Sequence, residues 1–297
     1  MSTTVHRVTQ HAIAERSLRG LQGNLTTMGR LQEQLSSGRQ ILRPSDNPTG
    51  TSSAMQLRGE VRRNEQWSRN ADDGIAWLGT IDSTLQGMLP QVNKVRELVL
   101  QGLSTGSNND QSRVAMATEV DQLRENLIAA SNTTYLGRPL FGGTTTGGTA
   151  YDPSGAYQGD GGQVRRTVGD GVSVRVDLTG TEAFGPAGAD LFATLAQISD
   201  HLRNDPDALS ADLTQLDSLS AGLRTSLGDV GARYNRLEVS QSAADGRVGD
   251  LSASLSDVEN IDLPDTVMRL QLANTAYQAA LGATAKVIQP SLMDFLR

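Results

Sequence analysis

An apolar stripe recurs along one stretch of the chain, from Leu209 to Val258. Alternating steps of four and three residues keep apolar side chains on one helical face, and only Ser220 and Gln241 interrupt the pattern. Sustained spacing near 3.5 residues predicts a long helix in coiled-coil contact with another helix. The preceding Asp205-Pro206 is a helix-start signal, with an acidic N-cap and proline at the first helical position.

Two more helical tracts precede this stripe in the sequence. The first runs from Leu78 to Val99 with the same spacing, and the second from Met116 to Ala130, with Asp110 as its expected cap. Pro90 lies inside the first tract, where we expect it to break a backbone hydrogen bond or to kink the helix. We expect both tracts to pack with the 209–258 helix as an elongated bundle.

Both ends of the chain carry apolar stripes of their own. Breaker clusters separate these stripes from the bundle: RPSDNPTG at 43–50 and ENIDLP at 259–264. Because the breakers stand at mirrored places, we expect the two ends to form one domain together. The residues expected to serve subunit assembly on these stripes are Leu18, Leu21, Leu25, Met28, Leu35, Leu270, Tyr277, Leu281, Ile288, Leu292, Phe295 and Leu296.

Two interpretations of the terminal stripes compete. The plainer one is a pair of amphipathic helices that pack on a core of their own. Against it, a pair of helices must overcome a large backbone entropy with few buried side chains, so two helices alone are marginally stable. We therefore expect the ends to order fully only when neighbouring subunits add contacts.

Residues 137–190 differ from the rest of the chain. They begin with a Gly- and Thr-rich stretch, and then apolar and polar residues alternate from Val164 to Val168 and from Val172 to Leu178. The Gly169-Asp170-Gly171 sequence between these runs is a turn signal. Strict alternation around such a turn predicts a β-hairpin within a small β module.

These patterns together predict a mostly α fold: an elongated helical bundle with coiled-coil terminal helices and a small inserted β domain. Residues 1–42 and 260–297 are expected to be the paired terminal helices, which form the assembly domain. Residues 43–136 and 191–259 are expected to be the bundle core, and residues 137–190 the β-rich insert.

Composition limits the class of function. Aromatic residues make up only 4% of the chain, which argues against one large globular core, since aromatics supply much of the buried area in such cores. The formal net charge of -7 disfavours contact with nucleic acid and anionic membranes. The chain has no cysteine, which excludes disulfides and thiolate sites. We expect no membrane span and no cleaved signal peptide, because no apolar run has the necessary length.

The residues that could carry catalysis do not form a recognisable site. His6 and His11 lack the i, i+4 spacing of two ligands on one helix face, and we expect them at the surface. Asp72 and Asp73 are adjacent, so they point to different helix faces and more readily cap or solvate a helix than act as a pair. The glycines at 142–162 lack a phosphate-loop context. We expect no catalytic residue, no cofactor and no metal.

Several segments, in order and at matching distances, resemble the flagellin family of the bacterial flagellum. Within that family, the RPSDNP sequence and the short middle favour the proteins of the hook–filament junction, as does a β segment that ordinary flagellin lacks. Pro90 and Pro290, which lie in tracts read as helical, and the extra Arg297 depart from the family pattern. The matching segments are 30–63, 69–85, 95–102, 120–144, the β segment 157–180, 231–238 and 291–296.

The resemblance implies a structural adaptor that joins the hook-associated protein layer to the flagellin filament. The implied partners are neighbouring copies of the chain, the longer hook-associated protein, flagellin and a flagellar export chaperone. The implied location is the extracellular flagellum, reached by the flagellar type III export pathway without a cleaved signal. Two alternatives stay open, a flagellin-like filament subunit and a cytoplasmic coiled-coil scaffold, with a hydrolytic enzyme as a distant third.

Overall fold

The computed structural model describes residues 3–104 and 110–288. The chain forms two compact units, one made of Met1–Val61 and Gly249–Arg297 and the other of Arg62–Val248. The sequence predicts three parts instead, with the β-rich insert separate from the bundle core, and that division stays a prediction. Along the chain the elements are α1 (Thr3–Ser37), α2 (Pro48–Leu103), α3 (Asp110–Ser131), β1 (Thr134–Tyr135), β2 (Arg138–Pro139), β3 (Arg165–Gly169), β4 (Val172–Arg175), α4 (Gly180–Phe184), α5 (Leu191–Asn204), the 3-10 helix η1 (Pro206–Ala208), α6 (Leu209–Glu259) and α7 (Leu263–Ile288).

Helices α2 and α6 run antiparallel in the larger unit. Arg96 binds Asp217 at 2.7 Å near one end of the contact, and Asp72 accepts a bond from Gln241 further along. The predicted heptad stripes form this seam, because their apolar side chains are buried. The buried stripe residues are Leu78, Ile81, Leu85, Met88, Val92, Val95 and Val99 on α2, and Leu209, Leu216, Leu223, Val230, Leu237 and Ala244 on α6.

The predicted starts and breaks of these helices are only partly right. Helix α2 continues through Pro90, where we expected a lost hydrogen bond or a kink; tertiary packing outweighs the single lost hydrogen bond. Pro206 is the first residue of η1, which leads into α6, but the Asp205 side chain makes no capping bond. Asp110 is itself the first residue of α3, where its carboxylate pairs with Arg113.

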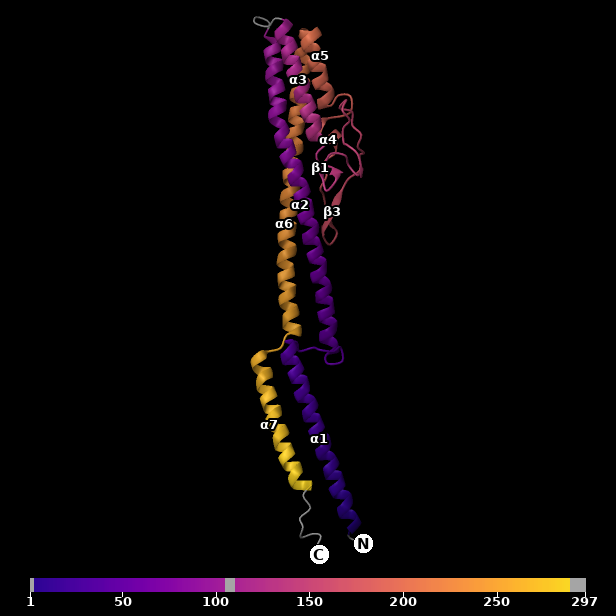
Figure 1. The fold of residues 1–297 in the computed structure, drawn as a ribbon, viewed down its shortest axis with the longest axis vertical. Coiled ribbons are helices and arrows are strands. Elements are labelled where there is room, and N and C mark those ends of the chain that lie inside the picture. Colours follow the sequence, from indigo (N-terminus) through magenta and orange to yellow (C-terminus); the bar gives the residue numbers. More distant parts are fainter. Residues whose placement is uncertain (1–2, 105–109, 289–297) are drawn as a thin grey trace. The chain divides into compact units, whose positions relative to one another are not determined.

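Two antiparallel hairpins form the β region, which lies along one side of the helices of the larger unit (Figure 1). The predicted hairpin is β3–β4, with Asp170-Gly171 at its turn. The sequence did not predict the β1–β2 hairpin, whose turn is Leu136-Gly137. Both turn residues have positive φ, 48° at Leu136 and 76° at Gly137, as a type I′ turn requires. A non-glycine residue in that region costs about 1–2 kcal/mol.

The β region packs tightly against the helices. A Cβ atom added to Gly74 of α2 would lie 2.8 Å from Leu237 and 2.9 Å from Val176, so glycine is needed where the chain after β4 meets both helices. Phe184 stacks edge-on with Phe141 at 5.0 Å between ring centroids and also contacts Tyr151. The few aromatic residues of this chain are therefore concentrated where loops and helices meet.

An ion-paired group beside β4 holds the start of α4. Arg175 donates to both oxygens of the fully buried Asp177 at 3.0 Å and reaches Glu182 at 2.7 Å. The hydrogen bond from Arg175 lowers the pKa of Glu182 to about 2. Glu182 also accepts a bond from the backbone N–H of Thr179, which completes a capping box for α4.

Candidate functional site

Helices α1 and α7 lie side by side in the smaller unit (Figure 1). The most buried side chains of this seam are Leu21 and Leu31 on α1 and Thr266 and Thr284 on α7. Both threonine hydroxyls donate to the backbone carbonyl four residues earlier in the chain, so their burial leaves neither hydroxyl unpaired. The seam is thus narrow, with a small share of large aliphatic side chains.

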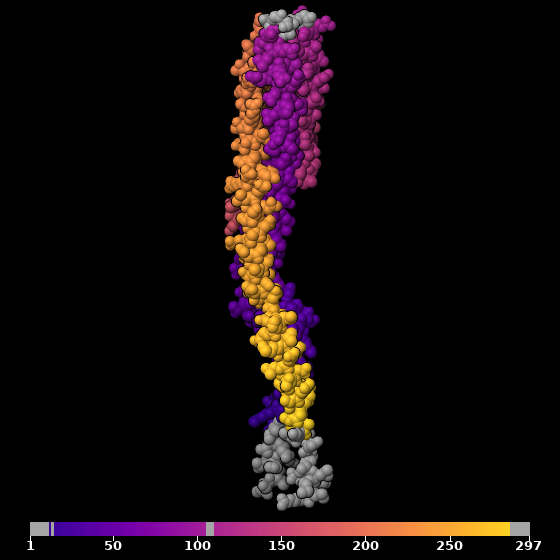
Figure 2. All heavy atoms as spheres, turned by 90° about the vertical axis from the view of Figure 1, so that its left-hand side faces the viewer, coloured from indigo at the N-terminus to yellow at the C-terminus, as the bar shows by residue number. Residues whose placement is uncertain are grey.

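A second set of apolar side chains on the same helices faces solvent. Leu18 is 52% exposed on α1, and Leu272 is 70% exposed on α7. Figure 2 views α7, in yellow, from the side turned away from α1, and that face is open. Several exposed apolar side chains on one pair of helices favour a contact with another protein over an ordinary solvated face. The exposed set consists of Leu18, Leu25, Leu263, Val267, Met268, Leu272 and Leu281.

The structure divides the predicted assembly residues between the two surfaces. Leu21 is buried in the seam, and Met28, Leu35, Leu270 and Tyr277 are partly buried. The exposed members are Leu18, Leu25 and Leu281. Ile288 is the last residue of α7, and its side chain lies outside the described part, as do Leu292, Phe295 and Leu296.

Sequence reasoning missed several members of both surfaces. Leu31 lies three residues after Met28 and four before Leu35, a spacing that could have placed it on the seam. Thr284 gave no such signal, because it interrupts an apolar stripe in the sequence and yet is only 8% exposed. Met268 and Leu272 are four residues apart, on a face that the single predicted stripe did not include.

Backbone hydrogen bonds join the two chain segments at the base of this helix pair. The N–H of Gln40 donates to the carbonyl of Glu259 at 2.7 Å, and the N–H of Ile261 donates to the carbonyl of Gly38 at 3.1 Å. Arg39 and Asn260 form an antiparallel bridge between these bonds. The ends of α1 and α6 are therefore fastened to each other where each helix stops.

A polar cavity of about 350 Å³ lies beside this bridge. Its lining carries charges of both signs, including Arg30, Asp46 and Asp262, and Arg269 is already paired with Asp265 at 2.8 Å. Within residues 3–104 and 110–288, no group of three or more histidine, cysteine, aspartate or glutamate side chains could hold a metal ion.

The residues weighed for catalysis have structural partners instead. Asp73 pairs with Arg166 of β3 at 2.7 Å, while the adjacent Asp72 accepts a bond from α6, so the two carboxylates diverge. His201 of α5 contacts Asp212 of α6 at 2.6 Å, and this hydrogen bond raises the pKa of His201. The side chains of His6 and His11 lie outside the described residues.

The described helices can also be compared with the length and hydropathy of a membrane-spanning helix. None of those within 3–104 and 110–288 combines the length and the apolar character that crossing a bilayer requires.

The chain matches known flagellar proteins in sequence. The family model described as the bacterial flagellin N-terminal helical region matches residues 8–146. Flagellar hook-associated protein 3 of Escherichia coli is 25% identical over 93% of this chain and 95% of its own length. Flagellin of Bacillus subtilis is 26% identical over 95% of this chain and 96% of its own length.

Solved structures of hook-associated proteins share the fold. A putative flagellar hook-associated protein from Vibrio parahaemolyticus has a TM-score of 0.66 at 22% identity and covers 72% of this chain and all of its own length. Hook-associated protein 3 from Legionella pneumophila has a TM-score of 0.62 at 15% identity and covers 69% of this chain and 98% of its own. In sequence the chain is therefore similar to flagellar proteins, hook-associated protein 3 and flagellin among them, and its fold is similar to that of solved hook-associated proteins.

Proposed function

We propose that this protein is a structural adaptor that joins the hook-associated protein layer of the flagellum to the flagellin filament. The observation that carries the proposal is the apolar surface left exposed on the α1–α7 pair. A repeating array buries such a surface between copies, whereas an isolated chain exposes it to water at a free-energy cost. Similarity to hook-associated protein 3 over nearly the whole chain supports the same function.

The partners in this proposal follow from the position of a junction layer. Neighbouring copies of the chain contact it sideways, the longer hook-associated protein lies on the hook side, and flagellin lies on the filament side. A flagellar export chaperone binds the C-terminal stripe before export, and the chain leaves through the flagellar type III pathway without a cleaved signal. The role is structural rather than enzymatic, as in the flagellar proteins that the chain resembles.

Deletion of the gene in its native host tests the proposal. We expect cells that carry hooks without attached filaments and shed flagellin into the medium, and we expect the wild-type gene to restore filaments. In the restored cells, antibodies should find the protein in the external flagellar fraction. Normal filaments in the deletion strain would reject the adaptor function.

A flagellin-like filament subunit is the second candidate, because flagellins match the chain with similar identity and coverage. The match to hook-associated protein 3 over 93% of this chain, together with the fold shared with solved hook-associated proteins, supports the junction protein. Purified protein decides between them: a filament subunit polymerises alone into long filaments, whereas a junction protein does not. A cytoplasmic scaffold, the third candidate, would stay inside the cell.

A further inference from the structure

Leu136 is an exposed apolar residue at the tip of the β1–β2 hairpin. Its side chain is 79% exposed, and its φ of 48° lies in the region that leucine rarely adopts. Asparagine or glycine suits the first position of a type I′ turn far better. Leucine here gains neither burial nor a favourable backbone conformation within its own chain, and an outlier of this kind points to a functional contact.

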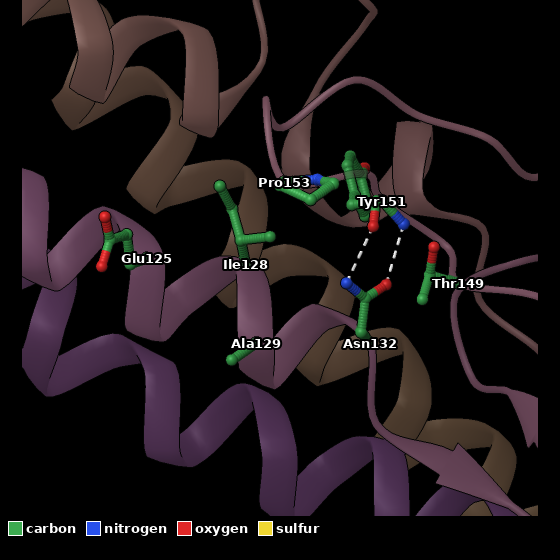
Figure 3. Close-up of a pocket in the computed structure, with 7 residues that line it drawn as sticks. All are labelled: Glu125, Ile128, Ala129, Asn132, Thr149, Tyr151 and Pro153. Atoms are coloured by element: carbon green, nitrogen blue, oxygen red, sulfur yellow. Dashed lines mark hydrogen bonds between the residues drawn. The ribbon is translucent and has the colours of Figure 1, made fainter.

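An apolar hollow of about 340 Å³ lies elsewhere on the same unit, between α3 and the loop that joins the two hairpins (Figure 3). Ile128 and Ala129 of α3 form one wall, and Tyr151 and Pro153 form the other. The side-chain amide of Asn132 accepts a bond from the backbone N–H of Tyr151 and donates to its carbonyl, each at 2.8 Å. These two bonds fix the far wall, so the hollow is preformed and large enough for a leucine side chain.

The charges beside the two features are complementary. Glu125 lies at the rim of the hollow and forms no ion pair with any residue in the described ranges. Arg138, two residues after Leu136, is partly exposed; its guanidinium lies 5.6 Å above the ring of Trp77, and its Nη2 donates to the carbonyl of Thr144 at 3.5 Å. An acidic rim beside an apolar hollow thus matches a basic residue beside an apolar tip.

We propose that Leu136 of one copy inserts into the hollow of the neighbouring copy, so that the two features form a lateral contact within the junction layer. Because the tip and the hollow are different patches of one chain, the contact is heterologous and propagates into a ring or a helical array. The inference rests on the proposed function, because a layer of identical copies brings each tip next to a hollow.

Cysteine cross-linking tests the contact directly, because the natural chain has no cysteine. Cells would express two single-cysteine chains together, Leu136→Cys and Ala129→Cys, and their isolated flagella would be treated with a mild oxidant. We expect 129–136 disulfide dimers, identified by mass spectrometry, severalfold in excess of either homodimer. Val239→Cys, at an exposed position of α6, replaces Leu136→Cys as the matched control and should give no such excess.

Each outcome of this experiment is decisive. If the chains are present in the flagella but 129–136 dimers do not exceed the control, the lateral contact is rejected and the adaptor function stands. If the chains are absent from the flagella, the adaptor function fails, and the lateral contact fails with it. A photo-activatable residue at position 136 identifies the partner independently: capture of residues 125–153 of a second copy supports the contact, and capture of another flagellar protein overturns it.

Two substitutions test the consequence for the junction. Leu136→Asn keeps the turn but removes the apolar tip, and Glu125→Arg reverses the charge at the rim. Each should increase severalfold the fraction of filaments detached by a fixed shear, without lowering the melting temperature of the purified chain. Unchanged detachment in both variants would contradict the contact.

Discussion

The guanidinium of Arg58 lies 2.7 Å from the carboxylate of Glu259, although 201 positions separate the two residues along the chain. The carbonyl of Glu259 also accepts a hydrogen bond from the N–H of Gln40, so this residue at the end of α6 binds both α2 and the segment that follows α1. Only 11% of the Glu259 side chain is exposed, so the Arg58 guanidinium replaces contacts with water that the carboxylate has lost. The two chain segments at the base of the α1–α7 pair are therefore held together by an ion pair as well as by backbone hydrogen bonds.

Removing Arg58 should loosen this region first. Arg58→Met leaves a largely buried carboxylate without its charged partner, at a cost of about 1–3 kcal/mol. We expect faster amide hydrogen exchange at residues 38–47 and 259–262, with little change in the helices of the larger unit. Arg62→Met, which removes an exposed arginine of the same helix, is the control, and an equal effect of both substitutions would contradict the assignment.

The contact between His201 and Asp212 should make stability depend on pH. The hydrogen bond to Asp212 raises the pKa of His201 above its ordinary value of 6.5 in the folded chain. A raised pKa means that the pair contributes its full stability below about pH 6.5 and loses it as pH rises through the folded pKa. Thermal melts between about pH 5.5 and pH 8.5, the range in which histidine titrates, should show this loss of stability.

Two variants isolate that contribution. His201→Gln and Asp212→Asn both remove the ion pair, so their melting temperatures should vary less over the same pH range than that of the natural chain. If all three proteins lose stability in parallel, other groups govern the dependence.

The turn at Leu136 should be improvable by one substitution. Leu136→Asn places a residue that tolerates positive φ at this position and should raise the free energy of unfolding by about 1 kcal/mol. Gly137→Ala is the opposite control, because alanine at a φ of 76° is strained and should destabilise the chain. Chemical denaturation measures both, and a loss of stability in Leu136→Asn would contradict the turn assignment.

Replacing residues 137–190 with a Gly/Ser linker tests whether the β region is separable. From the sequence, the Gly/Pro-rich segments that bound this region and the hairpin that it carries predict that the bundle stays folded without it. In the structure, Val176 and Leu237 both lie against Gly74, and Phe184 is buried among aromatic rings. We therefore expect a loss of at least about 3 kcal/mol, the cost of truncating a single buried phenylalanine. A natural melting temperature and an unchanged signal at 222 nm would restore the original prediction.

The sequence predicted best those features that a pattern of nearby residues determines, such as a heptad stripe or a favoured turn. The α2–α6 seam was predictable because heptad spacing and burial coincide from Leu78 to Val99. The α1–α7 seam was predictable only as a pair, because an amphipathic stripe does not tell which of two adjacent faces meets the partner. Thus Leu25 was assigned to the same face as Leu21 but is exposed. The β1–β2 hairpin was missed because Leu136-Gly137 is not a favoured turn sequence, whereas Asp170-Gly171 is.

The difference between exposed residues and seam residues guides a test of the terminal helices. Leu25, Leu272 and Leu281 are 44%, 70% and 44% exposed, so changing all three to serine removes few contacts within the chain. Surface substitutions usually change stability by about 0.5 kcal/mol or less each, so the melting temperature should stay nearly unchanged. By contrast, Leu31→Ser places a hydroxyl in the seam between α1 and α7 and should destabilise that helix pair.

The triple variant, although nearly as stable as the natural chain, should be the one that disrupts assembly in cells if the exposed set binds neighbouring subunits. Every copy of the triple variant lacks the same contacts, so the defect repeats throughout the array, and we expect hooks without attached filaments by electron microscopy. Val239→Ser, at an exposed residue of α6, is the matched control and should leave filaments normal. Normal filaments in the triple variant, or a large fall in its melting temperature, would reject the assembly role. Because a chaperone could use the same surface, the medium must also be assayed: protein that is exported but not incorporated places the defect at the junction, and retained protein places it before export.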